Sequence, residues 1–180
     1  MNFKSKIIIV LLAYSSLLIF TNTACQKLWF CDDEELTMVQ TEYNGALKLH
    51  GYYYYKKDVG YEMYILYKNG IVINERFSEN SLSEIENTYL LNEGYQELQH
   101  STKTTWGLFR ITNSTIAAQS WRTSQCKRPV VEYRGEVLTD TSFNINTYID
   151  ENGETNTIDE SIYYFKAFSP KPDSTNDFIN

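Results

Sequence analysis

Apolar and polar residues alternate along much of the chain with the two-residue period of β-strands. In the first such stretch, residues 47–57, one face carries Leu47, Leu49, Tyr53 and Tyr55, and the other carries Lys48, His50, Tyr52, Tyr54 and Lys56. Charged side chains are seldom fully buried without a partner. We therefore predict that Leu47, Leu49, Tyr53 and Tyr55 face the core, and that Tyr52 and Tyr54 face outward.

The run of four tyrosines puts two aromatic rings on each face of this strand, so neither face is purely polar. One explanation is that a helix or the C-terminal tail covers the second face. The other is that the tyrosines form an exposed or cavity-lining platform for a ligand, since a tyrosine offers both a stacking surface and a hydroxyl. Tyr53 and Tyr55 are the candidate ligand-facing residues.

Seven further stretches have strand character, which brings the expected number of strands to eight; they are residues 61–68, 71–77, 104–111, 116–121, 130–138, 142–149 and 161–168. Asn69-Gly70 predicts a tight hairpin between the first two of these stretches, because both residues tolerate positive φ. The turn-rich quartet 112–115 predicts a second hairpin. We expect a mainly β fold, an antiparallel eight-stranded meander or small up-and-down barrel, because closure removes exposed strand edges.

One helix is expected to interrupt the sheet after the third strand. Ser81 and Glu84 have the spacing of a capping box, and Leu82, Ile85 and Tyr89 share one helical face. Gly94 is placed to end the helix in the left-handed conformation. The tail from residue 170, which contains Pro170 and Pro172, cannot extend the last strand and is expected to pack across the outside or to fray.

The strand that carries Gly51, Tyr52 and Tyr53, with the meander after it, resembles the barrels of lipocalins. That resemblance implies a barrel with a concave site at its mouth. Lipocalins have Trp at the position of Tyr53, and their main helix follows the last strand. Residues 45–180 also resemble uncharacterised lipoproteins of Gram-negative bacteria, through Trp106-Gly107-Leu108-Phe109 and the segment 168–174. This second resemblance implies no activity.

The N-terminus has the features of a secretory signal peptide. Lys4 and Lys6 precede an uncharged, largely apolar stretch, residues 7–20, that is too short to span a bilayer as a helix. Ala24-Cys25 resembles a bacterial lipobox, although Asn22 stands where an aliphatic residue is usual. We expect lipidation of Cys25 and anchoring in the cell envelope, in the outer membrane of a Gram-negative cell. The alternative is ordinary cleavage after Ala24, which would give a secreted or periplasmic protein.

Lipidation of Cys25 would leave two cysteines, Cys31 and Cys126. They could close a disulfide in an oxidising compartment, or remain as two thiols. Residues 32–35 form a run of four carboxylates that should repel one another and stay solvated, as in a tether. The expected organisation is a signal peptide (1–24), a lipidated cysteine with an acidic tether (25–45), a β-barrel domain (46–169) and a tail (170–180).

Charge excludes one class of partner. The whole chain carries a net charge of −7, and removing residues 1–24 takes away two lysines and no carboxylate, which leaves −9. A nucleic-acid partner is therefore not expected, because phosphate binding needs clustered basic residues. The 15 Tyr, 9 Phe and 3 Trp residues agree with a β fold, and Trp106 and Trp121 are expected in the core.

Few residue patterns point to catalysis. His50 and His100 lie far apart without metal-ligand spacing, and no nucleophile or nucleotide-binding motif occurs, so we expect no metal, no cofactor and no enzyme activity. Paired carboxylates could serve glycoside hydrolysis, and four Glu residues lie on expected strands: Glu62, Glu75, Glu132 and Glu136. The alternation instead favours a solvated outer face for Glu62, and for Glu132 beside Arg134.

Two functions remain open from the sequence. The first is a structural or protein-interaction role for a membrane-anchored envelope lipoprotein whose barrel is filled by side chains. The second is a lipocalin-like barrel that binds a small apolar, aromatic or sugar ligand. The width of the interior separates them, because an eight-stranded barrel can be packed by its own side chains or can hold one small ligand.

Overall fold

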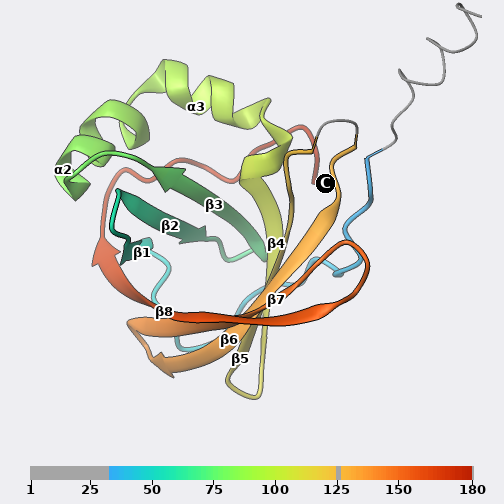
Figure 1. The fold of residues 1–180 in the computed structure, drawn as a ribbon. Coiled ribbons are helices and arrows are strands. Elements are labelled where there is room, and N and C mark those ends of the chain that lie inside the picture. Colours follow the sequence, from blue (N-terminus) through green and yellow to red (C-terminus); the bar gives the residue numbers. More distant parts are fainter. Residues whose placement is uncertain (1–32, 125–126, 180) are drawn as a thin grey trace, which may run out of the picture.

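The computed structural model describes residues 33–124 and 127–179, and this part contains eight antiparallel strands that close into a barrel in chain order (Figure 1). The strands are β1 (Gly51–Lys56), β2 (Tyr61–Leu66), β3 (Ile71–Phe77), β4 (Trp106–Thr112), β5 (Thr115–Trp121), β6 (Val130–Thr139), β7 (Ser142–Ile149) and β8 (Thr155–Ala167). The predicted up-and-down barrel is confirmed. None of the helices described is long and apolar enough to cross a membrane.

The barrel closes because β1 pairs on both of its sides. Tyr53 lies opposite Tyr64 of β2 and opposite Phe165 of β8. The largest difference from the predicted strand bounds is in β8, which begins at Thr155 instead of residue 161. Its first residues are exposed and polar, but Thr155 and Thr157 pair with Ile149 and Thr147 of β7. Backbone pairing extends the strand where the apolar alternation has ended.

Both predicted hairpins are present, but in the first turn only Gly70, and not Asn69, takes a positive φ. Gly70 has φ +81°, and a side chain there would meet the Thr41 carbonyl oxygen at 2.4 Å, so only glycine fits. In the β4–β5 turn, Asn113 and Ser114 have φ of 49° and 70°. Positive φ at both central residues matches the right-handed twist of the flanking strands.

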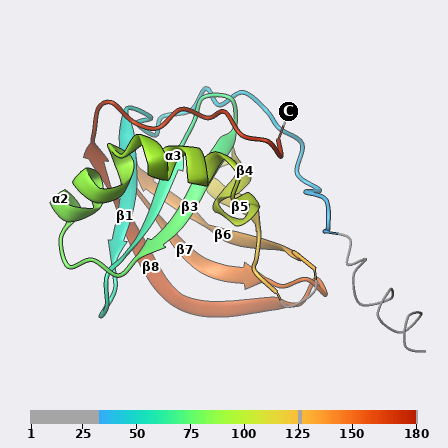
Figure 2. The same ribbon diagram turned by 90° about the horizontal axis from the view of Figure 1, so that it is seen from above.

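The segment between β3 and β4 is helical but broken. It consists of α2 (Leu82–Ile85), the π-helical η1 (Glu86–Leu90), α3 (Glu93–His100) and the 3-10 turn η2 (Lys103–Thr105). Ser81 caps α2 by accepting a hydrogen bond from the Glu84 backbone N–H at 3.2 Å, as predicted. The prediction that Gly94 ends the helix is wrong, because Gly94 lies in the first turn of α3, where the Asn92 side chain caps the new helix through the Tyr95 N–H. Figure 2 shows α2 and α3 lying across β1 and β3.

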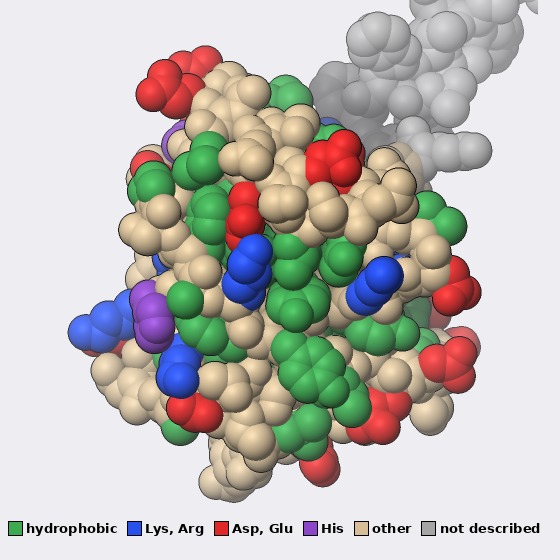
Figure 3. Space-filling model, turned by 90° about the vertical axis from the view of Figure 1, so that its left-hand side faces the viewer, with side chains coloured by type: hydrophobic (Ala, Val, Ile, Leu, Met, Phe, Trp, Pro, Cys, Tyr) green, Lys and Arg blue, Asp and Glu red, His purple; other side chains and the backbone are tan. Residues whose placement is uncertain are grey.

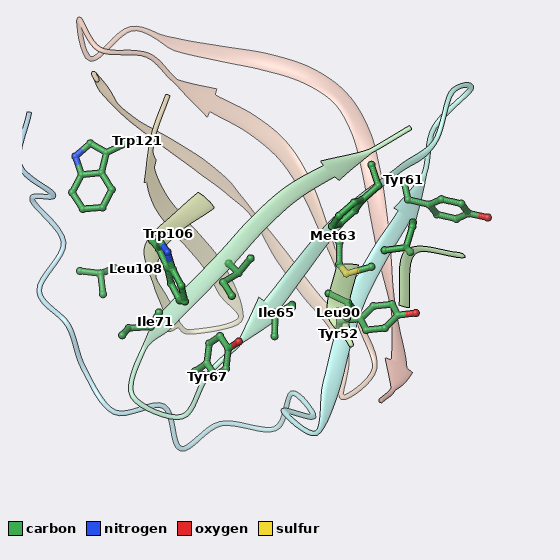
Figure 4. Close-up of a cluster of buried hydrophobic side chains, with 14 of the residues drawn as sticks. Tyr52, Tyr61, Met63, Ile65, Tyr67, Ile71, Leu90, Trp106, Leu108 and Trp121 are labelled. Carbon is green, nitrogen blue, oxygen red and sulfur yellow. The ribbon is translucent and has the colours of Figure 1, made fainter. Parts of the chain in front are cut away.

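Buried apolar residues form two clusters on opposite faces of the sheet. The inner cluster lies inside the barrel and comprises Leu47, Tyr53, Tyr64, Leu66, Val72, Phe109, Ile116, Ala118, Phe143, Ile145 and Tyr163. The outer cluster lies on the outside of the strands, under the helical segment, the N-terminal segment and the C-terminal tail. It includes Tyr52, Tyr61, Met63, Ile65, Tyr67, Ile71, Ile85, Leu90, Trp106, Leu108 and Trp121 (Figure 4). Both tryptophans are in the core, as predicted.

The first strand divides its tyrosines between these clusters. Leu47 and Tyr53 are buried in the inner cluster, and Leu49 and Tyr55 pack against it, so these four residues face the core as predicted, although Leu47 and Leu49 precede β1 instead of lying on it. Tyr52 points away from the interior, but its exposed fraction is 0%. The Tyr52 hydroxyl donates to Glu86 of η1 at 2.6 Å, and its ring packs against Phe168. Helix and tail therefore both cover the second face.

The acidic segment before the barrel does not stay solvated. The Asp33 carboxylate lies 3.0 Å from Lys103 and 3.1 Å from Arg128, and the Glu34 carboxylate lies 2.6 Å from Lys127. The prediction of a solvated acidic run is therefore wrong for Asp33 and Glu34, because Lys103 of η2 and the two basic residues just before β6 neutralise them. Residues 33–48, which we call the N-terminal strap, run along the barrel (Figure 1), and Tyr43 and Leu47 in their second half pack against the inner cluster.

The C-terminal tail also packs across the outside. Tyr67 donates a hydrogen bond to the Pro172 carbonyl at 2.8 Å. The Lys171 ammonium donates to the carbonyls of Leu49 and Leu66 and lies 4.2 Å from the centre of the Tyr67 ring. Burial lowers the pKa of Lys171 to about 8. These contacts fix the tail against β1 and β2.

Candidate functional site

The barrel wall opens where β3 and β4 separate. The two strands pair only through Ile71–Ile73 and Trp106–Leu108, whereas β3 stays paired with β2 as far as Phe77. The last residues of β3 therefore have no strand beside them on the β4 side. The helical segment covers this gap from outside, where Tyr95 and Gln99 of α3 both donate hydrogen bonds to Glu75.

A hollow of about 520 Å³ lies at this gap, and we call it the mouth pocket. Its lining combines arginines, hydroxyl groups and aromatic rings contributed by β3, η2 and β5 to β8. The lining residues are Asn74, Glu75, Arg76, Thr104, Thr105, Ser120, Trp121, Arg122, Thr123, Val131, Tyr133, Tyr148 and Ile158. A volume of this size lies within the range of small-molecule sites, about 300–1,000 Å³.

An ion-pair group stands at the β2–β3 side of the mouth. Glu62 is on the inner face of β2, with an exposed fraction of 5%. Its carboxylate lies 2.7 Å from the Lys57 ammonium and 3.5 Å from the Arg76 guanidinium. The prediction that Glu62 belongs to a solvated outer face is therefore wrong. Two cations offset the cost of placing this carboxylate inside the barrel.

Tyrosine hydroxyls approach the same group from below. Tyr64 is completely buried, and its hydroxyl has no hydrogen-bond partner among the described residues. Burial raises the pKa of Tyr64, and nearby Tyr163, Glu62 and Tyr133 raise it further. The inner cluster thus ends in a polar layer directly beneath the mouth.

The opposite rim carries a second arginine. The Arg122 guanidinium donates to the Tyr148 hydroxyl at 3.0 Å, and the Tyr148 ring packs against Tyr133 with 5.4 Å between centroids. Burial raises the pKa of Tyr133, and the charges of both Arg76 and Arg122 oppose that rise. Both guanidinium groups are therefore near one hydroxyl.

Glu75 is the one carboxyl residue in the described lining of the mouth pocket, and its ionised form is disfavoured. Burial raises the pKa of Glu75, although the hydrogen bonds from Tyr95 and Gln99 act in the other direction. Glu75 and Glu62 lie on opposite faces of the sheet, because one faces the helical segment and the other faces the interior. This arrangement does not give the facing pair of acids that glycoside hydrolysis needs.

Below the mouth the interior is filled by the barrel's own side chains. Tyr53, a predicted ligand-facing residue, packs against Phe143 and Phe165 and donates to the carbonyls of Lys48 and Asp140. Tyr55 packs against Tyr163. Neither Tyr53 nor Tyr55 lines the mouth pocket, and their contact with a ligand stays a prediction.

The other candidates from the sequence are dispersed. His50 packs on Phe165, and His100 is the last residue of α3, with its imidazole 3.7 Å from the Asp173 carboxylate. Within residues 33–124 and 127–179 no three His, Cys, Asp or Glu residues form a group that could hold a metal ion. Glu132 pairs with Arg134 on the outer face, as predicted, but its side chain is largely buried instead of solvated and also accepts a hydrogen bond from Gln119. The signal peptide, the lipidation site Cys25 and the disulfide candidates Cys31 and Cys126 lie outside the described residues.

Three more hollows, of about 690, 510 and 290 Å³, are lined mainly by the N-terminal strap. The face with α2 and the ends of β1 and β8 shows apolar side chains with basic and acidic ones among them (Figure 3). The mouth pocket differs from these surfaces because barrel strands and their inward side chains form most of its lining.

Comparison of the chain with protein-family models, with curated proteins and with solved structures found no match in any of the three.

Glu75 and Trp121 of the mouth lining were named from the sequence, as a candidate acid and a core residue, but its two arginines were not assigned to a site. Arg76 continues the inward face of β3 after Val72 and Asn74, so the alternation alone places it inside. A charged residue at an inward position of a predicted strand was the signal that could have identified it. Arg122 lies just after β5, and its place at the mouth depends on where β3 and β4 separate, which no local pattern reports.

Proposed function

We propose that this protein is a membrane-anchored envelope lipoprotein whose barrel binds a small ligand in the mouth pocket. Anchoring through a lipid on Cys25 is inferred from the sequence of the N-terminus. Binding without catalysis is inferred from the mouth, where the hydroxyls of Thr104, Thr105 and Ser120 have no histidine beside them in the described lining. No cofactor is part of this proposal.

A single observation carries the proposal: the interior is packed below the mouth but left open within it. Phe143 and Tyr163 stack with 5.1 Å between centroids, and Tyr64 meets both rings edge-on. A barrel that served only as a scaffold could continue this packing to its rim. Here the inward residues become polar, and they surround a hollow of about 520 Å³.

The test compares two substitutions on one strand. Ser120 of β5 lines the mouth pocket, whereas Thr115 at the other end of β5 is exposed. Ser120→Leu fills part of the hollow, and Thr115→Leu adds the same side chain away from it. Native mass spectrometry of protein purified from its own source should detect a bound small molecule in the unchanged protein and in Thr115→Leu, and little or none in Ser120→Leu.

Thermal unfolding of both variants checks that the barrel is intact. A ligand that Ser120→Leu retains fully would place binding elsewhere and contradict the proposal. If the unchanged protein carries no small molecule and binds none that is offered, a structural or protein-interaction role becomes the better explanation.

A further inference from the structure

We infer that the ligand of the mouth pocket carries a carboxylate, held between Arg76 and Arg122, on an apolar body. This inference rests on the proposed function and names the chemical class of the ligand. It follows from the small number of bonds that the two guanidinium groups make, from the charges around them, and from a buried hydroxyl beneath them.

Arg76 uses little of its hydrogen-bonding capacity. Its one described ion pair is with Glu62, at 3.5 Å, and its side chain is 63% exposed. The other Glu62 oxygen is occupied by Lys57 at 2.7 Å, so Lys57 already neutralises much of the Glu62 charge. A planar guanidinium with free N–H groups fits the two oxygens of a carboxylate.

Arg122 faces the same space from the other rim. The one described hydrogen bond of its guanidinium group is donated to the Tyr148 hydroxyl at 3.0 Å, a neutral acceptor that does not compensate the positive charge. Tyr133, which lines the pocket, is close enough to both arginines for each to act on its pKa. Arg76 and Arg122 therefore both line one pocket of a protein whose net charge is −7. The positive electrostatic potential that they create in the pocket favours an anionic ligand.

The carboxyl groups near the mouth do not cancel this field. Glu62 is paired with Lys57 and Arg76. Glu75 accepts hydrogen bonds from Tyr95 and Gln99, and burial raises its pKa toward the neutral form. The field within the pocket is consequently dominated by the two arginines.

The buried Tyr64 hydroxyl is the second, independent observation. It is one of a small number of buried polar atoms without a partner in the described part of the chain, and it lies within electrostatic range of Arg76 and Tyr133. Buried hydroxyls are nearly always bonded in folded proteins. The Tyr64 hydroxyl lies near Arg76 and can donate a hydrogen bond to a ligand oxygen when the Arg76 side chain moves toward the ligand.

The rest of the lining fits an apolar body. Val131 and Ile158 present aliphatic surface, and Tyr133 and Tyr148 present aromatic rings. A ligand with an acidic group at one end and an aromatic or aliphatic body would match the charged rim and this wall at the same time.

The experiment uses the full chain and a matched pair of probes, 4-phenylbutyrate and its neutral amide, with isothermal titration calorimetry. The variants are Arg76→Gln and Arg122→Gln, and the control is Arg110→Gln, because Arg110 is exposed on β4 and does not line the mouth pocket. We expect the acid to bind about tenfold or more tighter than the amide, since a hydrogen bond to a charged partner is worth about 1.5–3 kcal/mol. Either mouth variant should reduce this preference to about threefold or less, and Arg110→Gln should preserve it.

The outcomes separate the two proposals. If acid and amide bind equally well, or if the mouth variants leave the preference unchanged, the anion inference is wrong while ligand binding stands. The same holds if the molecule retained from the native source is neutral. If neither probe binds and no molecule is retained, both proposals are wrong. Inorganic phosphate, added as a competitor, should displace the acid weakly; stronger binding of phosphate than of the carboxylate would contradict the class named here.

Discussion

Two neighbouring tyrosines on opposite faces of β1 should contribute equally to stability. Tyr53 is 1% exposed and packs against Phe143 and Phe165, and Tyr52 is 0% exposed under the helical segment and the tail. Loss of a buried aromatic side chain typically costs about 3–5 kcal/mol. Each alanine variant should therefore lose a large part of a typical domain's stability, which is about 5–15 kcal/mol.

The assay is equilibrium urea unfolding of Tyr52→Ala, Tyr53→Ala and a control, Tyr164→Ala. Tyr164 lies on β8 with 54% of its surface exposed, so its removal should cost less than about 1 kcal/mol. Unchanged slopes with shifted midpoints would show that the variants differ in stability alone. A cost for Tyr52→Ala as small as that of the control would refute the conclusion that helix and tail bury this face.

Tyr52→Phe separates the hydroxyl from the ring. The Tyr52 hydroxyl donates to Glu86, and the same carboxylate oxygen lies 2.7 Å from the Lys166 ammonium. Lys166 stays as a partner for Glu86 in the variant, so the loss should be about 1–2 kcal/mol, toward the lower end for a bond to a charged group. A loss equal to that of Tyr52→Ala would mean that the ring packing contributes little.

Three further predictions concern the strap and the cysteines. Desolvation raises the pKa of the Asp33 carboxyl, but hydrogen bonds from Lys103 and Arg128 outweigh it, and the net pKa is lowered. The free energy of unfolding that this carboxylate contributes is therefore present at neutral pH and is lost as pH falls below about 4. Asp33→Asn should flatten this part of a pH–stability curve, and a curve identical to that of the unchanged protein would contradict the prediction. Cys25→Ala should release the protein from membranes, and a variant that still sediments with them would rule out a lipid on Cys25. Cys31 and Cys126 should resist thiol labelling in unfolded protein until a reductant is added, whereas full labelling without reductant would indicate free thiols.

The elements that could be predicted from the sequence are those that local chemistry determines. Asn69-Gly70 and Ser81 act within a few residues of themselves, and the structure has the hairpin and the helix start that they predict. Gly94 was misplaced because a nearer polar side chain, Asn92, begins a second helix before the first can end at the glycine. The helix-starting residue Asn92 precedes the helix-ending residue Gly94 in the chain, so the glycine falls inside the new helix.

The candidate site could not be predicted in the same way because its charges are balanced between neighbouring strands, and their pairing depends on the register of the sheet. Glu62 on an alternating strand resembles a solvated outer-face residue, and its inward position depends on Lys57 and Arg76 being folded against it. Likewise, the acidic run 32–35 has the sequence of a free tether, but in the fold Lys103 and Arg128 lie beside Asp33. An ion pair between distant residues has no local pattern, so the sequence alone favours solvation for each partner.

The inner face of β3 shows how stability and binding are divided along the barrel. It passes from buried Val72 through half-buried Asn74 to charged Arg76 as it approaches the mouth. Replacing a buried ion pair by well-packed apolar residues is often neutral or stabilising in proteins, so packing alone does not explain the buried Glu62 carboxylate that pairs with Arg76 there. The lower layers, with Phe143 and Tyr163, supply the apolar burial that a barrel of this size needs. The charged rim is therefore better explained by what enters the mouth than by what holds the fold together.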